Sequence, residues 1–535
     1  MLLPTDPEKF RLVSMLLIAG SWFGVFTMTL AEPILRARWS NVTRESRFAV
    51  KTWSIVITLT LAISFFIGAY TWLSLTRHDQ FNSTGYDLAI NEQIVWNTLN
   101  GRFFASSVEV DNSFGDHFRP MLLILVPIYA FSQTPQTLLI IQVLVLASAA
   151  IPIYYLAKLK LQDDVVAAAL AMIYLLYPAI GFVVRFDFHI EIFVIPAFIA
   201  AFYMMETGRW QMASFFLVIP LLCKENMGFT VTTFGLYALL RWKKYKWGGI
   251  WAIVGILFTW LTTFWLLPLV RGEAIDTLSR YAWLGSNPLE MMQMMLMEPF
   301  AVAKHLFTEA NMLYALQLLL PVGLLAIFGF RELLLGLPAL AINLLSNHFC
   351  QSTIYCHYTI PIIPIIFIAT VFGLLFIKEH LPEGSSWRLY ALIPIVLTCL
   401  SFWVSNPFQE TSLLPSAFEQ IGNAEVVKMA LDSVPADGVL VTTNDYASHL
   451  ARRPGLYIIG IPSQREAPID PDIIFLNLYD QQYILCDQIQ EYIQSLAPDD
   501  YGATFRTGGL IVLQRNAGSA EQFIDFRDNW NNCAG

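Results

Sequence analysis

Residues 76–120 read TRHDQFNSTGYDLAINEQIVWNTLNGRFFASSVEVDNSFGDHFRP. This stretch follows a long apolar run that ends near residue 75 and precedes another that begins at residue 121. Its charged groups nevertheless include Asp87, Glu92, Asp116 and His117. Polar groups at this density cannot lie in lipid, because the bilayer core offers them no water to bind. We therefore interpret the stretch as a long folded loop at a membrane surface that also contributes to a site roofed by the surrounding helices.

The composition is that of an integral membrane protein. Of the 535 residues, 56% are hydrophobic and 14% are charged, whereas about a quarter of the residues are charged in soluble domains. From residue 406 to the end there are 17 acidic and 7 basic residues, against 24 and 25 before it. We predict a nearly neutral transmembrane domain, residues 51–405, followed by a soluble acidic domain, residues 406–535. Neither part has the basic face of a nucleic-acid-binding protein, so we exclude nucleic acid as a partner.

Apolar windows predict about twelve membrane spans. A span needs about 17–25 residues. Windows of that length lie near residues 11–31, 51–75, 136–157, 164–184, 312–329, 358–377 and 387–405, and shorter or crowded ones near 190–206, 210–223, 227–242, 247–270 and 333–346. The first window is too long for a signal-peptide core and lacks a small-residue cleavage site, so we expect residues 1–50 to form an additional span and a basic cytoplasmic loop.

The basic residues of short loops set the orientation. The basic loops, which include residues 36–51, 158–160 and 241–246, share the cytoplasmic side only if residues 120–132 do not cross. That segment is short and begins at Pro120, so we predict a re-entrant or interfacial helix. Both termini then lie outside, together with the long loop at 76–135 and the polar turns at 185–191, 223–226 and 347–358.

The acidic domain alternates between helical and strand patterns. EVVKMALDSVP, YASHLARR and DQIQEYIQSL have helical periodicity, and GVLVTT, LYIIG, DIIFLNL and GLIVLQR have the apolar content of buried strands. This alternation predicts a small α/β domain.

Two cysteine pairs lie in regions predicted to be outside. Cys350 and Cys356 share one turn, and Cys486 and Cys533 share the acidic domain. Disulfides would form there in an exported compartment, and buried free thiols are the alternative.

Asp87 begins a helical pattern just after the turn Ser83–Thr84–Gly85. It is either an ordinary helix-capping carboxylate or a functional group. The functional reading gains weight because Asp116 and His117 lie in the same loop, at the outer end of the segment that dips toward lipid.

The RFDFHIEIF turn places Arg185, Asp187, His189 and Glu191 at alternate positions among aromatic residues. Charged groups at a span end are costly unless they are paired or functional, although an interfacial aromatic belt with snorkelling charges is the simpler reading. The order Asp-x-His-x-Glu could also ligate Mn or Zn.

Two further turns carry candidate residues. Lys224 and Glu225 interrupt an apolar region and form either a pair at a tight turn or a phosphate-binding lysine with its neighbour. His357 and Tyr358 open a span. A histidine at a span end is often structural, but in an outer site it could bind phosphate or accept a proton.

A family resemblance rests on five strings: GYDLAINEQIVWNTLNGRFF, FGDHFRPMLLILVPIYAF, LLYPAIGFVVRFDFHIE, LLCKENMGFTV and CHYTIPIIPIIFIA. Together with the segment SVPADGVLVTTNDYASHLARRPGLYIIG, they resemble domain-of-unknown-function family 2079, a set of prokaryotic predicted membrane proteins. The resemblance covers most of the chain from about residue 50 onward.

That family is grouped with the GT-C glycosyltransferases, and the resemblance implies their properties. Those enzymes are polytopic, take a sugar from a polyprenyl-phosphate donor and carry an acidic residue in a long first outer loop, here Asp87. This chain has no adjacent acidic pair or Asp-x-Asp there, which leaves a divalent cation as an open question. The implied location is the inner membrane, with the C-terminal domain in the periplasm or at the cell surface.

On this hypothesis Asp87 takes the proton of the acceptor. Lys224, Arg185 or His357 would hold the leaving phosphate, and Asp116 and Asp187 would orient the acceptor or a metal. An inactive scaffold or a subunit of a membrane complex is the alternative. A transporter is disfavoured because the polar residues gather at one face and not at mid-membrane.

Overall fold

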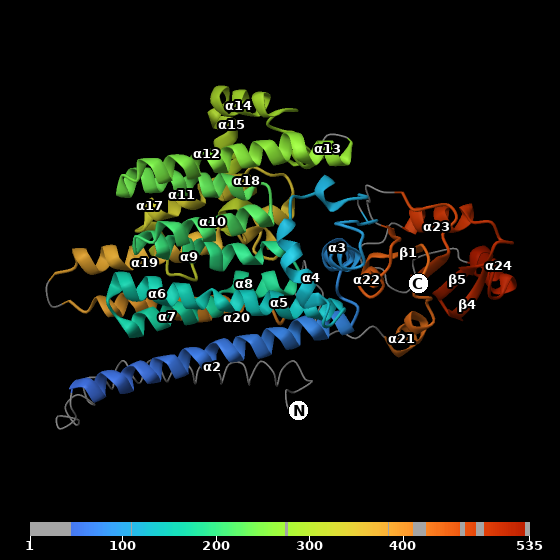
Figure 1. Cartoon of the computed structure of the whole chain (residues 1–535), viewed down its shortest axis with the longest axis horizontal. Helices are drawn as coiled ribbons and strands as arrows, with labels where there is room; N and C mark the ends of the chain where they lie inside the picture. Colours follow the sequence, from blue (N-terminus) through green and yellow to red (C-terminus); the bar gives the residue numbers. More distant parts are fainter. Residues whose placement is uncertain are drawn as a thin grey trace.

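The computed structural model describes residues 44–529 except residues 109, 273–275, 383–384, 410–423, 461–465 and 478–485. The span predicted near residues 11–31, residues 36–43 of the basic loop and Cys533 lie outside the described residues. The described chain forms a long bundle of helices and, at one end of it, a small sheet domain (Figure 1).

Six helices or helix pairs of the described part are long and apolar enough to cross a membrane, with mean hydropathies of 1.6 to 2.2. They are α2 (Arg44–Asp79), α5 with α6 (Pro135–Ser148, Ala150–Leu161), α7 with α8 (Asp164–Leu175, Pro178–Arg185), α12 through α13 (Tyr245–Leu261, Leu267–Arg271), α19 (Ile363–His380) and residues 387–404, which contain α20 (Leu392–Val404). The shorter bundle helices are α9 (Val194–Glu206), α10 (Trp210–Cys223), α11 (Met227–Trp242), α16 (Glu309–Leu319), α17 (Phe330–Leu333) and α18 (Leu337–Leu344). Twelve crossings therefore stay a prediction.

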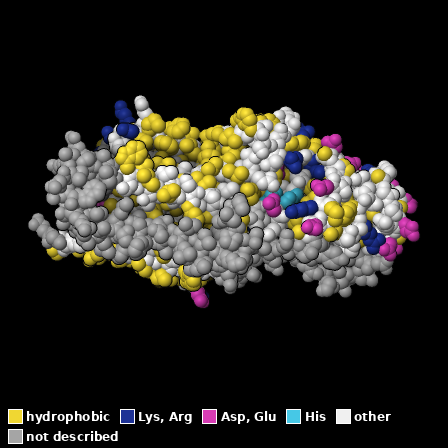
Figure 2. Space-filling model, turned by 90° about the horizontal axis from the view of Figure 1, so that it is seen from below, with side chains coloured by type: hydrophobic (Ala, Val, Ile, Leu, Met, Phe, Trp, Pro, Cys, Tyr) yellow, Lys and Arg dark blue, Asp and Glu magenta, His cyan; other side chains and the backbone are white. Residues whose placement is uncertain are grey.

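Small residues bring α11 and α12 into close contact. A Cβ atom added to Gly228 would lie 2.3 Å from the carbonyl oxygen of Gly255, and one added to Gly255 would lie 2.3 Å from that of Gly228. Lipid tails are as apolar as Leu side chains, so helix pairing in membranes depends on such close packing. Large apolar side chains on the outer face of α12, including Ile250, Ile253 and Leu257, are exposed. Figure 2 shows hydrophobic side chains spread over the helical part, as expected for a surface that faces lipid.

The loop at residues 76–120 folds against one end of the bundle. It contains a π-helical turn, η1 (Gly85–Ala89), and α3 (Ile90–Leu99). The next segment forms η3 (Pro120–Ile124) and α4 (Leu125–Tyr129), a run of ten residues that is too short to cross a bilayer. Another loop carries the apolar helices α14 (Pro288–Met297) and α15 (Pro299–Leu306), whose Leu296 and Phe300 are exposed.

The predicted C-terminal α/β domain is confirmed. Its five strands pair in the order β2-β1-β3-β5-β4, with β1, β2 and β3 parallel and β5 antiparallel to both β3 and β4. The strands are β1 (Leu440–Thr443), β2 (Leu456–Ile459), β3 (Ile473–Asn477), β4 (Tyr501–Thr507) and β5 (Leu510–Arg515), and the helices are α21 (Ala424–Asp432), α22 (Asn444–Ala447), α23 (Cys486–Ser495) and α24 (Ala520–Asn529).

Two elements of this domain differ from the sequence expectation. Strand β4 and helix α24 were not predicted, because β4 is an edge strand with a glycine and exposed polar residues and α24 has little apolar content. The helix expected over YASHLARR ends at Ala447, since the following residues turn toward β2. Cys350 and Cys356 form a disulfide, one of the two states left open above.

The sheet domain packs directly on the first loop. The backbone N–H of Gly85 donates to Oδ1 of Asn444 at 2.9 Å, and the Ser107 hydroxyl donates to the carbonyl oxygen of Leu456 at 2.8 Å. A Cβ atom at residue 85 would lie 2.3 Å from Cδ1 of Ile458, so only glycine fits this contact. The loop that carries Asp87 is thus held between the bundle and the sheet domain.

Candidate active site

Asp87 lies in the first turn of η1, and its side chain is 22% exposed. One carboxylate oxygen is 2.9 Å from Nε2 of His189, and the other accepts a hydrogen bond from the Thr84 hydroxyl at 3.1 Å. Asn91 donates to the backbone carbonyl of Asp87 at 2.9 Å, which fixes the turn. The carboxylate is therefore held by two side chains while part of it stays accessible.

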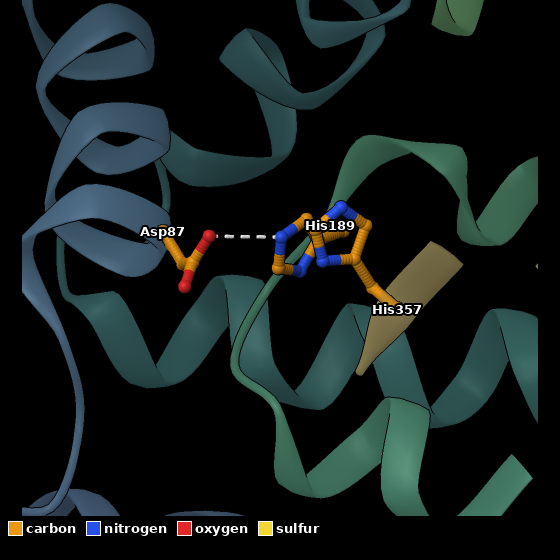
Figure 3. Close-up of side chains that lie close together, drawn as sticks. All are labelled: Asp87, His189 and His357. Carbon is orange, nitrogen blue, oxygen red and sulfur yellow. Dashed lines mark ion pairs between the residues drawn. The ribbon is translucent and has the colours of Figure 1, made fainter. Parts of the chain in front are cut away.

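His189 and His357 stack on each other beside this carboxylate. Their ring centroids are 3.7 Å apart, and both residues are buried (Figure 3). Burial lowers the pKa of His189, but the neighbouring Asp87 carboxylate outweighs that effect and the net shift is upward. Burial and the proximity of His189 hold the pKa of His357 well below its usual value. The two pKa shifts are opposite in direction, as expected when a positive charge on one of two stacked rings disfavours a charge on the other.

The residues that could hold a metal differ from those that the sequence suggested. Asp87, His189 and His357 each offer one ligand atom, and these atoms lie within 4.8 Å of one another. One carboxylate and two imidazoles suit Zn or Mn, and a set of three protein ligands leaves a position open for a reactant. In the predicted Asp-x-His-x-Glu set, by contrast, Asp187 pairs with Arg77 and Glu191 with Lys224.

Asp187 is linked to Asp87 through Thr84 and is itself held by a buried ion pair. Its carboxylate forms a buried ion pair with Arg77 and accepts hydrogen bonds from the backbone N–H and the hydroxyl of Thr84, at 2.9 and 3.1 Å. The residue has a positive φ of 78°, a conformation that non-glycine residues rarely adopt. Gln142 donates to its carbonyl at 2.7 Å. The Thr84 hydroxyl lies 3.1 Å from a carboxylate oxygen of Asp187 and 3.1 Å from one of Asp87, and it shares its one proton between them. Thr84 therefore links the buried ion pair to the more exposed carboxylate.

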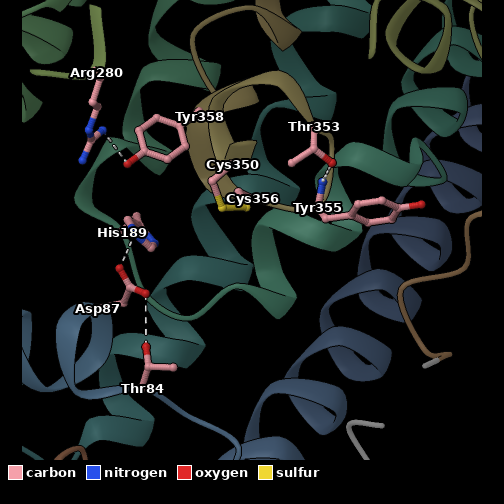
Figure 4. Close-up of a disulfide and its surroundings, with 9 residues drawn as sticks. All are labelled: Thr84, Asp87, His189, Arg280, Cys350, Thr353, Tyr355, Cys356 and Tyr358. Carbon is pink, nitrogen blue, oxygen red and sulfur yellow. Dashed lines mark hydrogen bonds and ion pairs between the residues drawn. A yellow bond between two sulfur atoms is a disulfide. The ribbon is translucent and has the colours of Figure 1, made fainter. Parts of the chain in front are cut away.

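Two cations lie close to the Tyr358 ring, and Figure 4 shows one of them, Arg280, beside Tyr358. Lys224 lies 5.9 Å from the Tyr358 ring centroid and forms an ion pair with Glu191 at 2.7 Å. Burial lowers the pKa of Lys224, but Glu191 more than offsets this and the net shift is upward, so Lys224 is protonated. The Arg280 guanidinium donates to the Tyr358 hydroxyl at 3.0 Å. Sequence reasoning missed Arg280, because it lies in a long loop with no motif around it.

The remaining candidates have clear partners. Nδ1 of His117 lies 3.0 Å from Glu225, whose other oxygen accepts from the Phe118 N–H at 3.1 Å. Asp116 pairs with Arg119 at 2.9 Å. These contacts fasten the end of the first loop to the turn that also carries Lys224.

Arg185, which the sequence suggested as a phosphate-binding residue, instead binds backbone carbonyl groups. It is 1% exposed and donates to the backbone carbonyl of Pro407 at 3.0 Å and to that of Gln409. These bonds fasten the segment that follows α20.

The contacts run continuously from Asp87 through His189, His357 and Tyr358 to Lys224. Five candidate residues from four distant segments therefore meet in one cluster, and Asp187 joins it through Thr84.

The bundle, the long first loop and the small sheet domain define a membrane protein with the GT-C glycosyltransferase fold. Within that class, the chain belongs to the family described as Predicted membrane protein (DUF2079), whose profile matches residues 77–512. No curated protein matches the sequence.

A solved structure with a TM-score above 0.5 has a similar fold. ArnT from Cupriavidus metallidurans bound to undecaprenyl phosphate has 11% sequence identity and a TM-score of 0.51, covering 86% of this chain and 98% of that one. The apo state of the same protein gives 11% identity, a TM-score of 0.45 and coverages of 87% and 98%. The Archaeoglobus fulgidus oligosaccharyltransferase in complex with Zn and sulfate has 10% sequence identity and a TM-score of 0.41, covering 84% of this chain and 73% of that one.

Proposed function

We propose that this protein transfers a sugar from a polyprenyl-phosphate donor to an envelope acceptor at the outer face of the inner membrane. The observation that carries the proposal is the meeting of Asp87 with His189 and His357 at the end of the bundle that the sheet domain covers. The fold shared with ArnT, whose structure holds undecaprenyl phosphate, supports the class of donor. In this proposal the sheet domain lies in the periplasm or at the cell surface.

Asp87 is the base. An acceptor hydroxyl attacks the anomeric carbon of the sugar, the bond from that carbon to the phosphate oxygen breaks, and the hydroxyl proton passes to the Asp87 carboxylate. The carboxylate suits this role because Thr84 and His189 fix it while 22% of its side chain stays exposed.

Lys224, Arg280 and His357 are placed to receive the leaving phosphate. Lys224 and Arg280 flank Tyr358, and His357 stacks on that ring at 4.1 Å. Fixed cations stabilise negative charge as it develops, and their contribution is largest where water is excluded. The ion pair with Glu191 orients the Lys224 ammonium, which has further donors for a phosphate oxygen.

Binding of a divalent cation is an alternative role for Asp87, His189 and His357. If Asp87, His189 and His357 bind a metal, the ion supplies positive charge at the reacting oxygens, and His189 must lose its proton to become a ligand. Two measurements separate these roles. If the three residues bind a metal, the purified wild-type protein contains the ion and Asp87→Asn contains less of it. If Asp87 acts as a base without a metal, transfer is unchanged after treatment with a chelator.

The test is transfer of labelled sugar from polyprenyl-phosphate donors in membranes that contain wild-type protein or Asp87→Asn. A general base contributes about 100-fold to 10,000-fold, so we expect at least a 100-fold loss at equal abundance. Asp470→Asn, on the exposed face of the sheet domain, is the matched control and should leave transfer unchanged. Absence of transfer by the wild-type chain across a broad donor panel would contradict the proposal and favour the inactive scaffold or complex subunit.

A further inference from the structure

A recess lies between the end of α2, the first loop and the sheet domain. It has a volume of about 550 Å³ and is lined by Asp79 and Phe81 at the end of α2, by Trp96 of α3 and by residues of the sheet domain. This volume falls in the range of small-molecule sites, roughly 300–1,000 Å³. None of the residues assigned above to the base or to the phosphate lines the recess.

The sheet domain contributes three cations to this recess: Lys428, Arg452 and Arg453. Within the described part of the chain, none of them forms an ion pair. The carboxylates of Asp79 and Asp432 also line the recess, which leaves one excess positive charge.

Arg453 is the most buried of the three, at 3% exposure, and its Nη1 atom has no hydrogen-bond partner in the described structure. Its other nitrogens donate to the carbonyls of Leu450 and Pro435 at 2.9 and 3.1 Å. Burial lowers the pKa of Arg453 to about 10. The Asp437 carboxylate partly offsets this burial through its charge, although the two residues form no ion pair in the described structure. Arg453 therefore adds positive charge to the wall of the recess.

Aromatic surface adds a second feature. The Trp96 ring is half-buried at the recess, with Arg102 5.0 Å from its centroid. Phe81 packs against His449 at 4.8 Å between ring centroids, so Trp96 is the aromatic ring with accessible surface. A flat apolar ring beside cations and carboxylates suits a ligand with apolar C–H faces, hydroxyl groups and a negative charge.

We infer that this recess binds an acidic saccharide. Lys428 and Arg452 attract its anionic group, Asp79 and Asp432 accept hydrogen bonds from its hydroxyls, and Trp96 packs on the ring. Figure 2 shows basic, acidic and histidine side chains gathered where the helical part meets the sheet domain. That this saccharide is the acceptor of the transfer rests on the proposed function, whereas the binding itself does not.

Binding is measurable without any transfer activity. The full chain in nanodiscs is titrated with glucuronic acid, with glucose and with inorganic phosphate, and saturation-transfer NMR reports each ligand. We expect glucuronic acid to bind more tightly than glucose. Lys428→Gln should weaken glucuronic acid binding roughly threefold to tenfold, since the lost contact is a charge-assisted one at a partly exposed site. Lys428 makes no hydrogen bond in the described structure, so this variant should fold normally.

Three further measurements decide the assignment. Trp96→Leu should weaken glucuronic acid and leave phosphate unchanged, whereas Arg515→Gln, an exposed cation paired with Asp470, should change neither. Equal binding of phosphate and glucuronic acid with no effect of Trp96→Leu would show a site that recognises charge alone and would overturn the saccharide assignment. Failure of glucuronic acid to bind, or binding unchanged by Lys428→Gln, would overturn the site.

Asp87→Asn should leave glucuronic acid binding intact, so failure of the proposed transfer is distinguishable from failure of this inference.

Discussion

The two ends of the helical bundle both carry ion pairs but use them differently (Figure 1). At the distal end, formed by the turn between α6 and α7 and by the end of α19, Lys158 pairs with Asp164 at 2.9 Å and Lys160 with Glu206. Asp163 caps α7 and pairs with Arg388. Asp163 and Asp164 lie at the N-terminus of α7 and Lys158 and Lys160 in the last turn of α6, which is the arrangement that stabilises helices. Glu206, at the C-terminus of α9, pairs with Lys160.

At the covered end, on which the sheet domain lies, helix stabilisation does not account for the polar groups. The Nδ1 atoms of His189 and His357 are buried without hydrogen-bond partners in the described structure, and Asp87 is held by side chains instead of capping a helix. Buried polar atoms without partners are rare in proteins and often mark a site that awaits a ligand. The distal end also has a buried oxygen without a hydrogen-bond partner in the described residues, Oε1 of Glu206, but the other oxygen of that carboxylate pairs with Lys160. The covered end differs because its unpartnered histidine nitrogens lie beside a carboxylate that is partly exposed.

The largest expected effect tests the buried support of the covered end. Asp187→Asn leaves the Arg77 guanidinium without its counter-charge, and breaking a buried pair costs about 3–5 kcal/mol. Thermal unfolding in detergent, followed by size-exclusion fluorescence, should show a large fall in Tm. The double variant Arg77→Gln with Asp187→Asn removes the uncompensated charge and should recover part of the loss. An unchanged Tm for the single variant would show that the pair does not support the loop.

The second effect is a pH dependence of the covered end. His449 stacks on His78 with ring centroids 4.0 Å apart, and Lys428 adds positive charge nearby. Burial at this junction lowers the pKa of His449 to about 4. The unfolded chain therefore binds this proton at a higher pH than the folded chain does. Stability that is present above about pH 6.5 is lost as the pH falls toward 4, by about 3 kcal/mol.

His449→Phe keeps the ring and removes this proton, so its Tm should fall less between pH 7 and pH 4 than that of the wild type. The matched control is His380→Phe, at an exposed position of the distal end. If both variants follow the wild-type pH profile, the junction is not the acid-sensitive part of the molecule.

The smallest effect tests the distal end. Asp163→Ala removes an acceptor for the backbone N–H groups of Val165 and Val166, at 3.0 and 3.2 Å, and an ion pair with Arg388. Loss of such a cap costs about 1–2 kcal/mol, so Tm should fall modestly while transfer per folded molecule stays unchanged. Asp163→Asn keeps a cap acceptor and should lose less. If Asp163→Ala kept its full Tm but lost most of its transfer activity, the distal end would take part in the reaction, and the two ends would not differ in this respect.

Some features were predictable because they depend on local pattern. The polar density of residues 76–120 and the acidic tail after residue 406 predicted a loop outside lipid and a separate α/β domain, and the sheet domain is present. The candidate residues of the 185–191 and 347–358 turns were named because charged groups at span ends are costly. Arg280 could not be found in this way, since its position beside Tyr358 arises from the return of a distant loop.

Residue roles were less predictable than residue identity. Asp187, His189 and Glu191 occupy alternate positions in one turn, and the sequence treats them alike. In the structure they pair with Arg77, Asp87 and Lys224 respectively, because a sharp turn with φ of 78° at Asp187 sends the neighbouring side chains in different directions. Backbone geometry of this kind is not encoded in residue spacing.

Hydropathy, charge and sequence pattern are enough to assign this chain to the membrane proteins of the family Predicted membrane protein (DUF2079), with an acidic α/β domain after the bundle. These properties act locally, so they are visible along the chain. The meeting of Asp87 with two stacked histidines, and the cationic recess between the sheet domain and the first loop, depend instead on three-dimensional packing. Those contacts join residues separated by a hundred positions or more, and they form because the packing of the helices brings the ends of distant spans to one place.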